Sequence, residues 1–116
     1  MDEKILKYLF DMQKAINEID DYFDNEVKDF NNYKNNLMLK RAVERNLEII
    51  GEATNRLLQR DQSFEAKISE TKSIIGLRNQ IIHAYDNISD ENIWSILINH
   101  IPKLKVEIDN LIRKHT

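Results

Sequence analysis

The sequence contains no cysteine among its 116 residues, which excludes disulfide bonds, thiol catalysis and zinc sites built on thiolate ligands. It has only two glycines and one proline, and β-branched residues never alternate with polar ones over a useful length, so no β-sheet is expected. No apolar run approaches the roughly 18 residues that a membrane span requires. The N-terminus also lacks a basic start followed by an apolar run. We therefore expect a cytoplasmic protein with no signal peptide and no membrane contact.

A surplus of basic residues is missing too. The chain carries 17 Lys and Arg against 20 Asp and Glu, which gives a formal net charge of −3. Proteins that hold nucleic acid by neutralising phosphates usually have a basic excess, so stable DNA binding is not expected. Contact with RNA at a local arginine-containing cleft remains compatible with this charge. The 41% hydrophobic and 32% charged residues are typical of a soluble globular protein, and the length fits a single domain over residues 1–116.

Apolar residues recur at steps of three and four in four segments, which predicts four amphipathic helices. The first three predicted ranges are 2–25, 35–59 and 71–85, and the fourth helix begins after an N-cap at Ser89. Pro102 removes one backbone hydrogen bond from this fourth helix, so a kink near Ile98 is expected. Because the connectors are short and polar, the sequence predicts an all-α, antiparallel four-helix up-and-down bundle. The predicted core stripes of the two longest helices consist of Ile5, Leu9, Met12, Ile16, Ile19 and Phe23, and of Leu39, Val43, Leu47, Ile50, Thr54 and Leu57.

The stretch that carries chemistry spans residues 76–86 and places Arg78, Asn79, His83 and Tyr85 on one short helix. At about 100° per residue, Arg78 and Tyr85 lie within about 20° of each other, whereas Arg78 and His83 are about 140° apart. One regular helix therefore does not bring Arg78 and His83 together. They converge only if the helix end is distorted, or if both flank a cleft shared with a second subunit.

These side chains suit the cleavage of RNA. Histidine titrates near neutrality and can act as a general acid or base, while arginine offers a fork of donors that matches phosphate oxygens. His83 and Arg78 are thus the candidate catalytic residues, with Asn79 in support. When the substrate's own 2′-hydroxyl attacks phosphorus, no metal is required, and only RNA carries that hydroxyl. The structural alternative is that Arg78 is an ordinary ion-pair partner and His83 a satisfied polar residue.

The order of these residues resembles the defining motif of HEPN domains, in which an arginine is followed by four residues and a histidine on the third helix of a four-helix bundle. Residues 76–85 (GLRNQIIHAY) look like the HepT-type version, where a tyrosine follows the histidine after one residue. Residues 43–53 (VERNLEIIGEA) are similar to the second-helix signature of the same group, and residues 93–94 (IW) and 101–104 (IPKL) to its last helix. The sequence departs from the family at residues 67–73, where relatives often carry prolines and a tryptophan.

The resemblance implies a metal-independent ribonuclease that works as the toxin of a toxin–antitoxin pair and needs no cofactor. It implies a homodimer in which Arg78 and His83 of both subunits face one cleft. The antitoxin of such a pair resembles a minimal nucleotidyltransferase that attaches AMP to the motif tyrosine, which by position is Tyr85. A second interpretation keeps the bundle without the activity, as a helical module that binds a nucleotidyltransferase partner. A purely structural helical dimer is the third.

Other polar groups allow more than one interpretation. Glu52 is a candidate cleft residue beside Gly51, a glycine that costs about 1 kcal/mol relative to alanine in a helix and so suggests either a close neighbouring helix or a neutral surface position. Trp94 fits a core or dimer position better than a platform for base stacking. An acidic cluster around Asp20 fits a solvated helix end better than a cation site. Surface pairing with interleaved glutamates is expected, ahead of RNA contact, for Arg41, Arg45, Arg56 and Arg60.

Overall fold

The computed structural model describes residues 2–24, 28–83 and 88–115, and all regular structure in these ranges is helical. The predicted Tyr85 lies outside the described residues. The elements are α1 (Glu3–Tyr22), α2 (Phe30–Lys34), α3 (Leu37–Arg60), the 3-10 helix η1 (Gln62–Ala66), α4 (Thr71–His83), α5 (Asp90–Asn99) and α6 (Ile101–His115).

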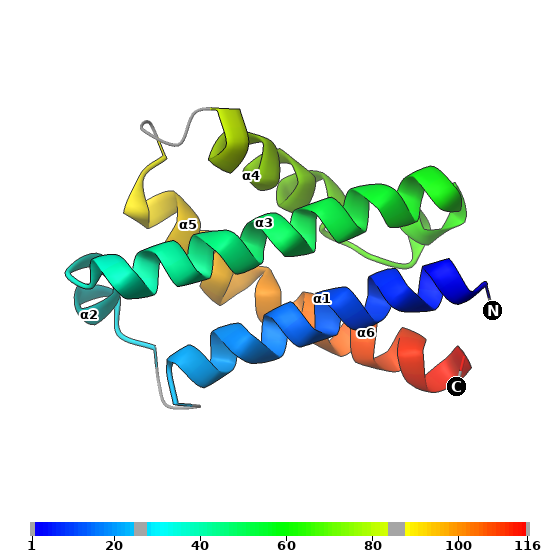
Figure 1. The fold of residues 1–116 in the computed structure, drawn as a ribbon, viewed down its shortest axis with the longest axis horizontal. Helices are drawn as coiled ribbons and strands as arrows, with labels where there is room; N and C mark the ends of the chain where they lie inside the picture. The colour runs from blue at the N-terminus through cyan, green and yellow to red at the C-terminus, as the bar shows by residue number, and fades with distance from the viewer. Residues whose placement is uncertain (1, 25–27, 84–87, 116) are drawn as a thin grey trace.

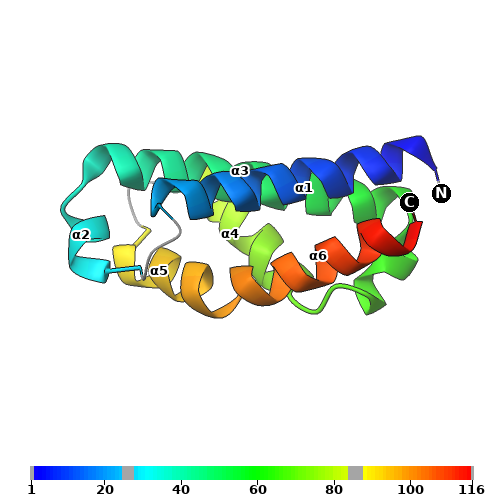
Figure 2. The same cartoon turned by 90° about the horizontal axis from the view of Figure 1, so that it is seen from below.

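The long helices alternate in direction, which confirms the predicted antiparallel bundle. In Figure 1, α1 and α3 run side by side in opposite directions, and α4 lies along the other edge of α3. Figure 2 shows α5 and α6 as one layer opposite α1 and α3, with both termini at the same end of the molecule. The helix α3 thus packs against α1 on one side and against α4 on the other. A site that draws residues from both α1 and α4 must therefore lie along α3.

The predicted core stripes are confirmed. Every member of the stripes predicted for α1 and α3 is buried, including Thr54, whose hydroxyl donates a hydrogen bond to the Ile50 carbonyl oxygen at 2.7 Å. The predicted N-cap is confirmed as well, because the Ser89 hydroxyl accepts the Asn92 N–H at 3.0 Å. None of the helices in the described ranges combines the length and the apolar character needed to cross a membrane.

The C-terminal part of the chain departs from the prediction of a single kinked helix. The structure has two helices, α5 and α6, separated at His100, and not a kink near Ile98. Pro102 explains the break, because it lies in the first turn of α6, where its missing N–H would have no partner within the helix. The backbone N–H of His100 closes α5 on the Ile96 carbonyl at 2.9 Å, and the His100 carbonyl accepts the Leu104 N–H at 3.0 Å.

The polar segments between the first three predicted helices also contain structure. The stretch 29–36 forms the short helix α2, and its Tyr33 is fully buried. The stretch 61–70 forms η1, which inserts Phe64 into the core, and is followed by buried Ile68. In each case one or two apolar residues within a polar segment are buried against the bundle. Their burial could not be predicted from the sequence because one or two apolar residues show no helical period. The first helix is also shorter than predicted, since it ends at Tyr22.

Candidate active site

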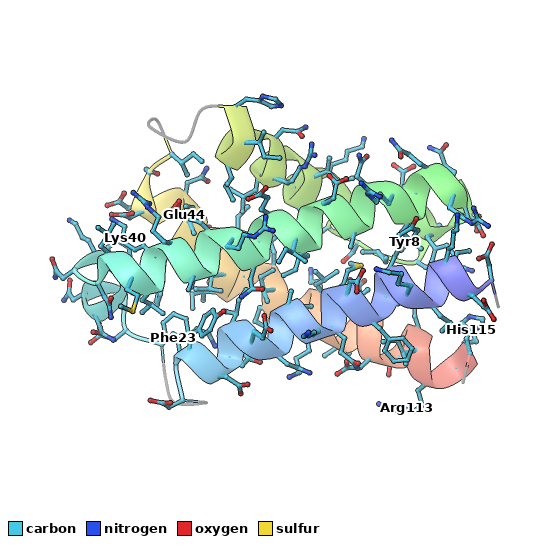
Figure 3. The ribbon with its side chains drawn as sticks, viewed as in Figure 1. Tyr8, Phe23, Lys40, Glu44, Arg113 and His115 are labelled. Carbon is cyan, nitrogen blue, oxygen red and sulfur yellow. The ribbon has the colours of Figure 1, made fainter. Side chains whose placement is uncertain are left out.

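A groove of about 370 Å³ lies among α1, α3 and α4. Tyr8, labelled in Figure 3, lies where α1 and α3 run side by side and contributes an aromatic ring to this groove. Arg78 enters it from α4. The groove is mixed in character, with four cations and three carboxylates among its lining residues, which are Lys7, Tyr8, Asp11, Arg45, Glu48, Ile49, Glu52, Ala53, Arg56, Arg78 and Ile82.

The close approach of α3 and α4 depends on Gly51. A Cβ added at Gly51 would collide with the Arg78 Cβ, and it would lie 2.9 Å from the Arg78 Cγ and 3.1 Å from the Ile74 carbonyl oxygen. Distances this short are not tolerated between carbon atoms in a packed interior. The glycine is therefore required because the stem of Arg78 rests directly on the α3 backbone, which confirms that a neighbouring helix comes close.

The guanidinium of Arg78 contacts two side-chain oxygens, one through an ion pair and one through a hydrogen bond. Its Nη2 lies 2.5 Å from Glu52 Oε2 on α3, and its Nη1 donates to the Asn79 side-chain oxygen at 2.8 Å. The hydrogen bond to Asn79 uses one of the two N–H groups on Nη1. The contact with Glu52 is an ion pair, since Glu52 Oε2 and Arg78 Nε are both buried without a hydrogen-bond partner among the described residues. The Arg78 side chain is 23% exposed, which leaves it reachable from the groove while its stem is packed.

Glu52 is bound by two arginines at once. Its Oε1 accepts a hydrogen bond from Arg56 Nε at 2.8 Å, and its Oε2 faces Arg78. The hydrogen bond from Arg56, together with the positive charges of both arginines, lowers the pKa of Glu52 below its ordinary value. The carboxylate is therefore ionised at neutral pH.

The other charged groups of the groove form local pairs. Lys7 contacts Asp11 at 2.8 Å along α1, and Arg45 contacts Glu48 at 3.3 Å along α3. Lys7, Tyr8 and Asp11 did not appear among the candidates drawn from the sequence. They flank the apolar stripe of α1 as ordinary polar positions, and no sequence pattern marks them as part of a site on another helix.

His83 lies apart from this arrangement. It is the last residue of α4, it is exposed, and it does not line the groove. Because α4 remains α-helical through His83, the angle of about 140° expected from Arg78 on a regular helix applies. Within one chain, the structure brings Arg78 together with Glu52 and Asn79 but does not bring His83 to them.

The remaining candidates take structural positions. Trp94 is partly buried, and its ring centroid lies 5.3 Å from that of Tyr33 and 5.5 Å from that of Phe30. Asp20 contacts two lysines, Lys28 and Lys105, each at 3.3 Å. Arg41, Arg45 and Arg56 pair with glutamates of α3 as expected, with Arg41 contacting Glu44 at 2.8 Å. Arg60 instead contacts Asp2, the residue before α1, also at 2.8 Å.

These features define a class of protein: a small antiparallel helical bundle whose central helices hold an arginine over a polar groove. The family model described as "Ribonuclease HepT-like" matches residues 12–111. The chain therefore belongs to the HepT-like ribonuclease family, as the resemblance in residues 43–53 and 76–85 predicted.

Three similar proteins cover between 73% and 91% of the chain. A protein of Methanocaldococcus jannaschii is 36% identical over 104 residues, which make up 88% of this chain and 91% of the relative. A second protein of that organism is 33% identical over 108 residues, covering 91% and 85%. One from Caldanaerobacter subterraneus subsp. tengcongensis is 32% identical over 85 residues, covering 73% and 75%. All three bear the name "Putative RNase". No solved structure matches the chain significantly.

Proposed function

We propose that the protein is a metal-independent endoribonuclease that uses Arg78 and His83. The observation that carries the proposal is the presentation of Arg78, whose stem is packed on Gly51 and whose guanidinium contacts Glu52 and Asn79 while 23% of the side chain stays exposed. A guanidinium held in this way is a preorganised donor for charge that develops on a phosphoryl group. Membership of a ribonuclease family supports RNA as the substrate.

The reaction needs no external nucleophile. His83 accepts the proton of a 2′-hydroxyl, the 2′-oxygen attacks the adjacent phosphorus, and the bond to the 5′-oxygen breaks. The products are a 2′,3′-cyclic phosphate and a 5′-hydroxyl, because the departing 5′-oxygen takes up a proton from a His83 imidazolium, so that protons balance. Arg78 stabilises the negative charge on the non-bridging oxygens. Since the nucleophile belongs to the substrate, a metal-bound hydroxide has no role in this scheme.

The separation of Arg78 and His83 on one helix supports a site completed by a second copy. His83 is exposed at the end of α4, so it is free to face a groove contributed jointly by two chains. A homodimer with a twofold axis near this end of α4 would place two arginines and two histidines around one RNA strand.

The cellular role follows from the sequence motif. We infer that the protein is a cytoplasmic toxin, and that a minimal nucleotidyltransferase antitoxin neutralises it by adding AMP to Tyr85. Tyr85 lies two residues after His83, so the added phosphate and nucleoside would occupy space that the RNA needs. The negative charge of AMP would also compete with RNA for Arg78.

The test compares the wild type with Arg78→Ala and His83→Ala on one RNA oligonucleotide, in the presence of a chelator. We expect cleavage by the wild type, a cyclic phosphate product and a loss of at least about 100-fold in both variants. The same oligonucleotide with 2′-deoxy nucleotides should remain intact. Loss of cleavage on chelation would reject the metal-free chemistry. Absence of cleavage combined with tight binding of a nucleotidyltransferase would favour the non-catalytic module.

A further inference from the structure

We propose that Glu52 is a positioning residue, which fixes the guanidinium of Arg78 in the orientation that receives the scissile phosphate. This inference rests on the proposed ribonuclease function, and it gives a role to a carboxylate on α3, a different helix from the one that carries the motif. Glu52 touches no part of the proposed reaction itself. It acts through Arg78.

The geometry holds Arg78 from three sides. Glu52 Oε2 faces Nη2 at 2.5 Å, the side-chain oxygen of Asn79 accepts from Nη1 at 2.8 Å, and the Arg78 stem rests on Gly51. An arginine side chain that is free in solution loses considerable rotamer entropy when it binds a ligand. In this arrangement that ordering takes place during folding, so it is not repeated when the substrate binds.

The second arginine keeps Glu52 from neutralising Arg78 completely. Arg56 lies one helical turn after Glu52 on α3 and donates from its Nε to Glu52 Oε1 at 2.8 Å. One negative charge is thus shared between two positive charges, and the three groups together keep a net charge of +1. This cluster can still attract a phosphate, while the charge of the paired carboxylate restrains the Arg78 guanidinium on one side, which a simple excess of cations would not do.

The main experiment removes the charge of Glu52 while keeping its size. In Glu52→Gln, we expect kcat for RNA cleavage to fall about 10- to 100-fold with a much smaller change in KM, because the arginine remains present but is poorly oriented. Glu44→Gln is the matched control, since Glu44 also pairs with an arginine of α3, Arg41 at 2.8 Å, but does not line the groove. Figure 3 shows Glu44 of α3 and Tyr8 of α1 toward opposite ends of the bundle.

A double-mutant cycle separates positioning from a general structural effect. If Glu52 acts through Arg78, Glu52→Gln should lower kcat in the wild-type background but cause no further loss in an Arg78→Ala background. Equal losses in both backgrounds would overturn the proposal. So would unchanged kinetics in Glu52→Gln.

A second readout does not depend on catalysis. The Nε–Hε signal of Arg78 in nuclear magnetic resonance spectra, assigned by its loss in Arg78→Ala, should show faster side-chain motion in Glu52→Gln than in the wild type or Glu44→Gln. If the wild type fails to cleave RNA, the proposed function is rejected while this measurement still decides the positioning role. Unaltered mobility of the Arg78 guanidinium in Glu52→Gln would reject that role by itself.

Discussion

Gly51 on α3 and Arg78 on α4 are in direct contact, because the arginine stem occupies the space that a side chain at residue 51 would need. The consequence is that the backbone of one helix serves as the supporting surface for the functional group of another. Glu52, the next residue after Gly51, is placed by the same contact beside the guanidinium. The packing of two helices and the geometry of the site are therefore the same structural feature.

This contact predicts opposite effects of alanine at the two glycines. Gly51→Ala should destabilise the protein by about 1–3 kcal/mol, because the added methyl forces α3 and α4 apart. Gly76→Ala should stabilise it by about 0.5–1 kcal/mol, since alanine favours a helix and nothing lies within 4 Å of a Cβ placed there. Denaturant unfolding measures both. Equal stability of the two variants would contradict the close contact.

The proposed shared cleft predicts that activity depends on protein concentration. If two chains are needed to bring Arg78 and His83 to one phosphate, the specific activity should be constant at high concentration and fall on dilution below the dissociation constant of the dimer. Analytical ultracentrifugation over the same range gives the fraction of dimer. Full specific activity in a sample that sediments as a monomer would exclude the shared cleft.

Replacing Tyr33 by phenylalanine, which removes the hydroxyl, should stabilise the protein. Its side chain is fully buried, and its hydroxyl has no hydrogen-bond partner among the residues that the structure describes. Tyr33→Phe should therefore raise the free energy of unfolding by about 1 kcal/mol. Tyr22→Phe is the control with the opposite sign, because the Tyr22 hydroxyl accepts from the buried Asn46 amide at 2.8 Å. A loss of stability in Tyr33→Phe would show that the hydroxyl has a partner.

The effect of Tyr33→Phe on the free energy of unfolding should depend on pH in the alkaline range. Burial, together with the negative charges of Glu44 and Asp90, raises the pKa of Tyr33 above its ordinary value of 10.0. Below that value the phenol is protonated in both the folded and the unfolded chain, so its titration does not affect the free energy of unfolding. As the pH rises above it, the free energy of unfolding falls, because the unfolded chain releases the phenolic proton more readily than the folded one. The advantage of Tyr33→Phe over the wild type should thus grow at alkaline pH, as thermal unfolding would measure.

Glu70 links the connector before α4 to the break between α5 and α6. Its carboxylate lies 2.8 Å from His100 Nδ1 and 3.5 Å from Lys103 Nζ, and the close contact with His100 is the main cause that lowers the pKa of Glu70 below 4.5. The stabilisation is present above pH 4.5 and is lost as the pH falls through the lowered value. Glu70→Gln should therefore lower the Tm modestly at pH 7, and the difference should shrink in acid.

Glu65→Gln is the control for this prediction. Glu65 lies in η1 on the same connector and contacts Gln62 at 3.3 Å without an ion pair among the described residues. Its substitution should leave the Tm nearly unchanged at both pH values. An equal effect of the two substitutions would attribute the change at Glu70 to general surface charge.

Much of the fold follows from the sequence because helix periodicity is a local property. Every residue predicted for the stripes of α1 and α3 is buried, since steps of three and four residues fix one face of a helix whatever packs against it. Ser89 was predictable as an N-cap for the same local reason. The burial of Tyr33 and Phe64 was not, because each lies in a polar segment with too few apolar residues to show a helical period, and is buried by distant parts of the chain.

By itself, the sequence determined that the protein is helical and which residues form the motif at 76–85. Both conclusions depend only on the spacing of residues that are near one another along the chain. Only the tertiary structure decided that Glu52 contacts Arg78 and that Tyr8 of α1 shares their groove. The physical reason is that spacing along a chain fixes the face on which a side chain lies. The helix that meets this face is chosen by the packing of the whole bundle.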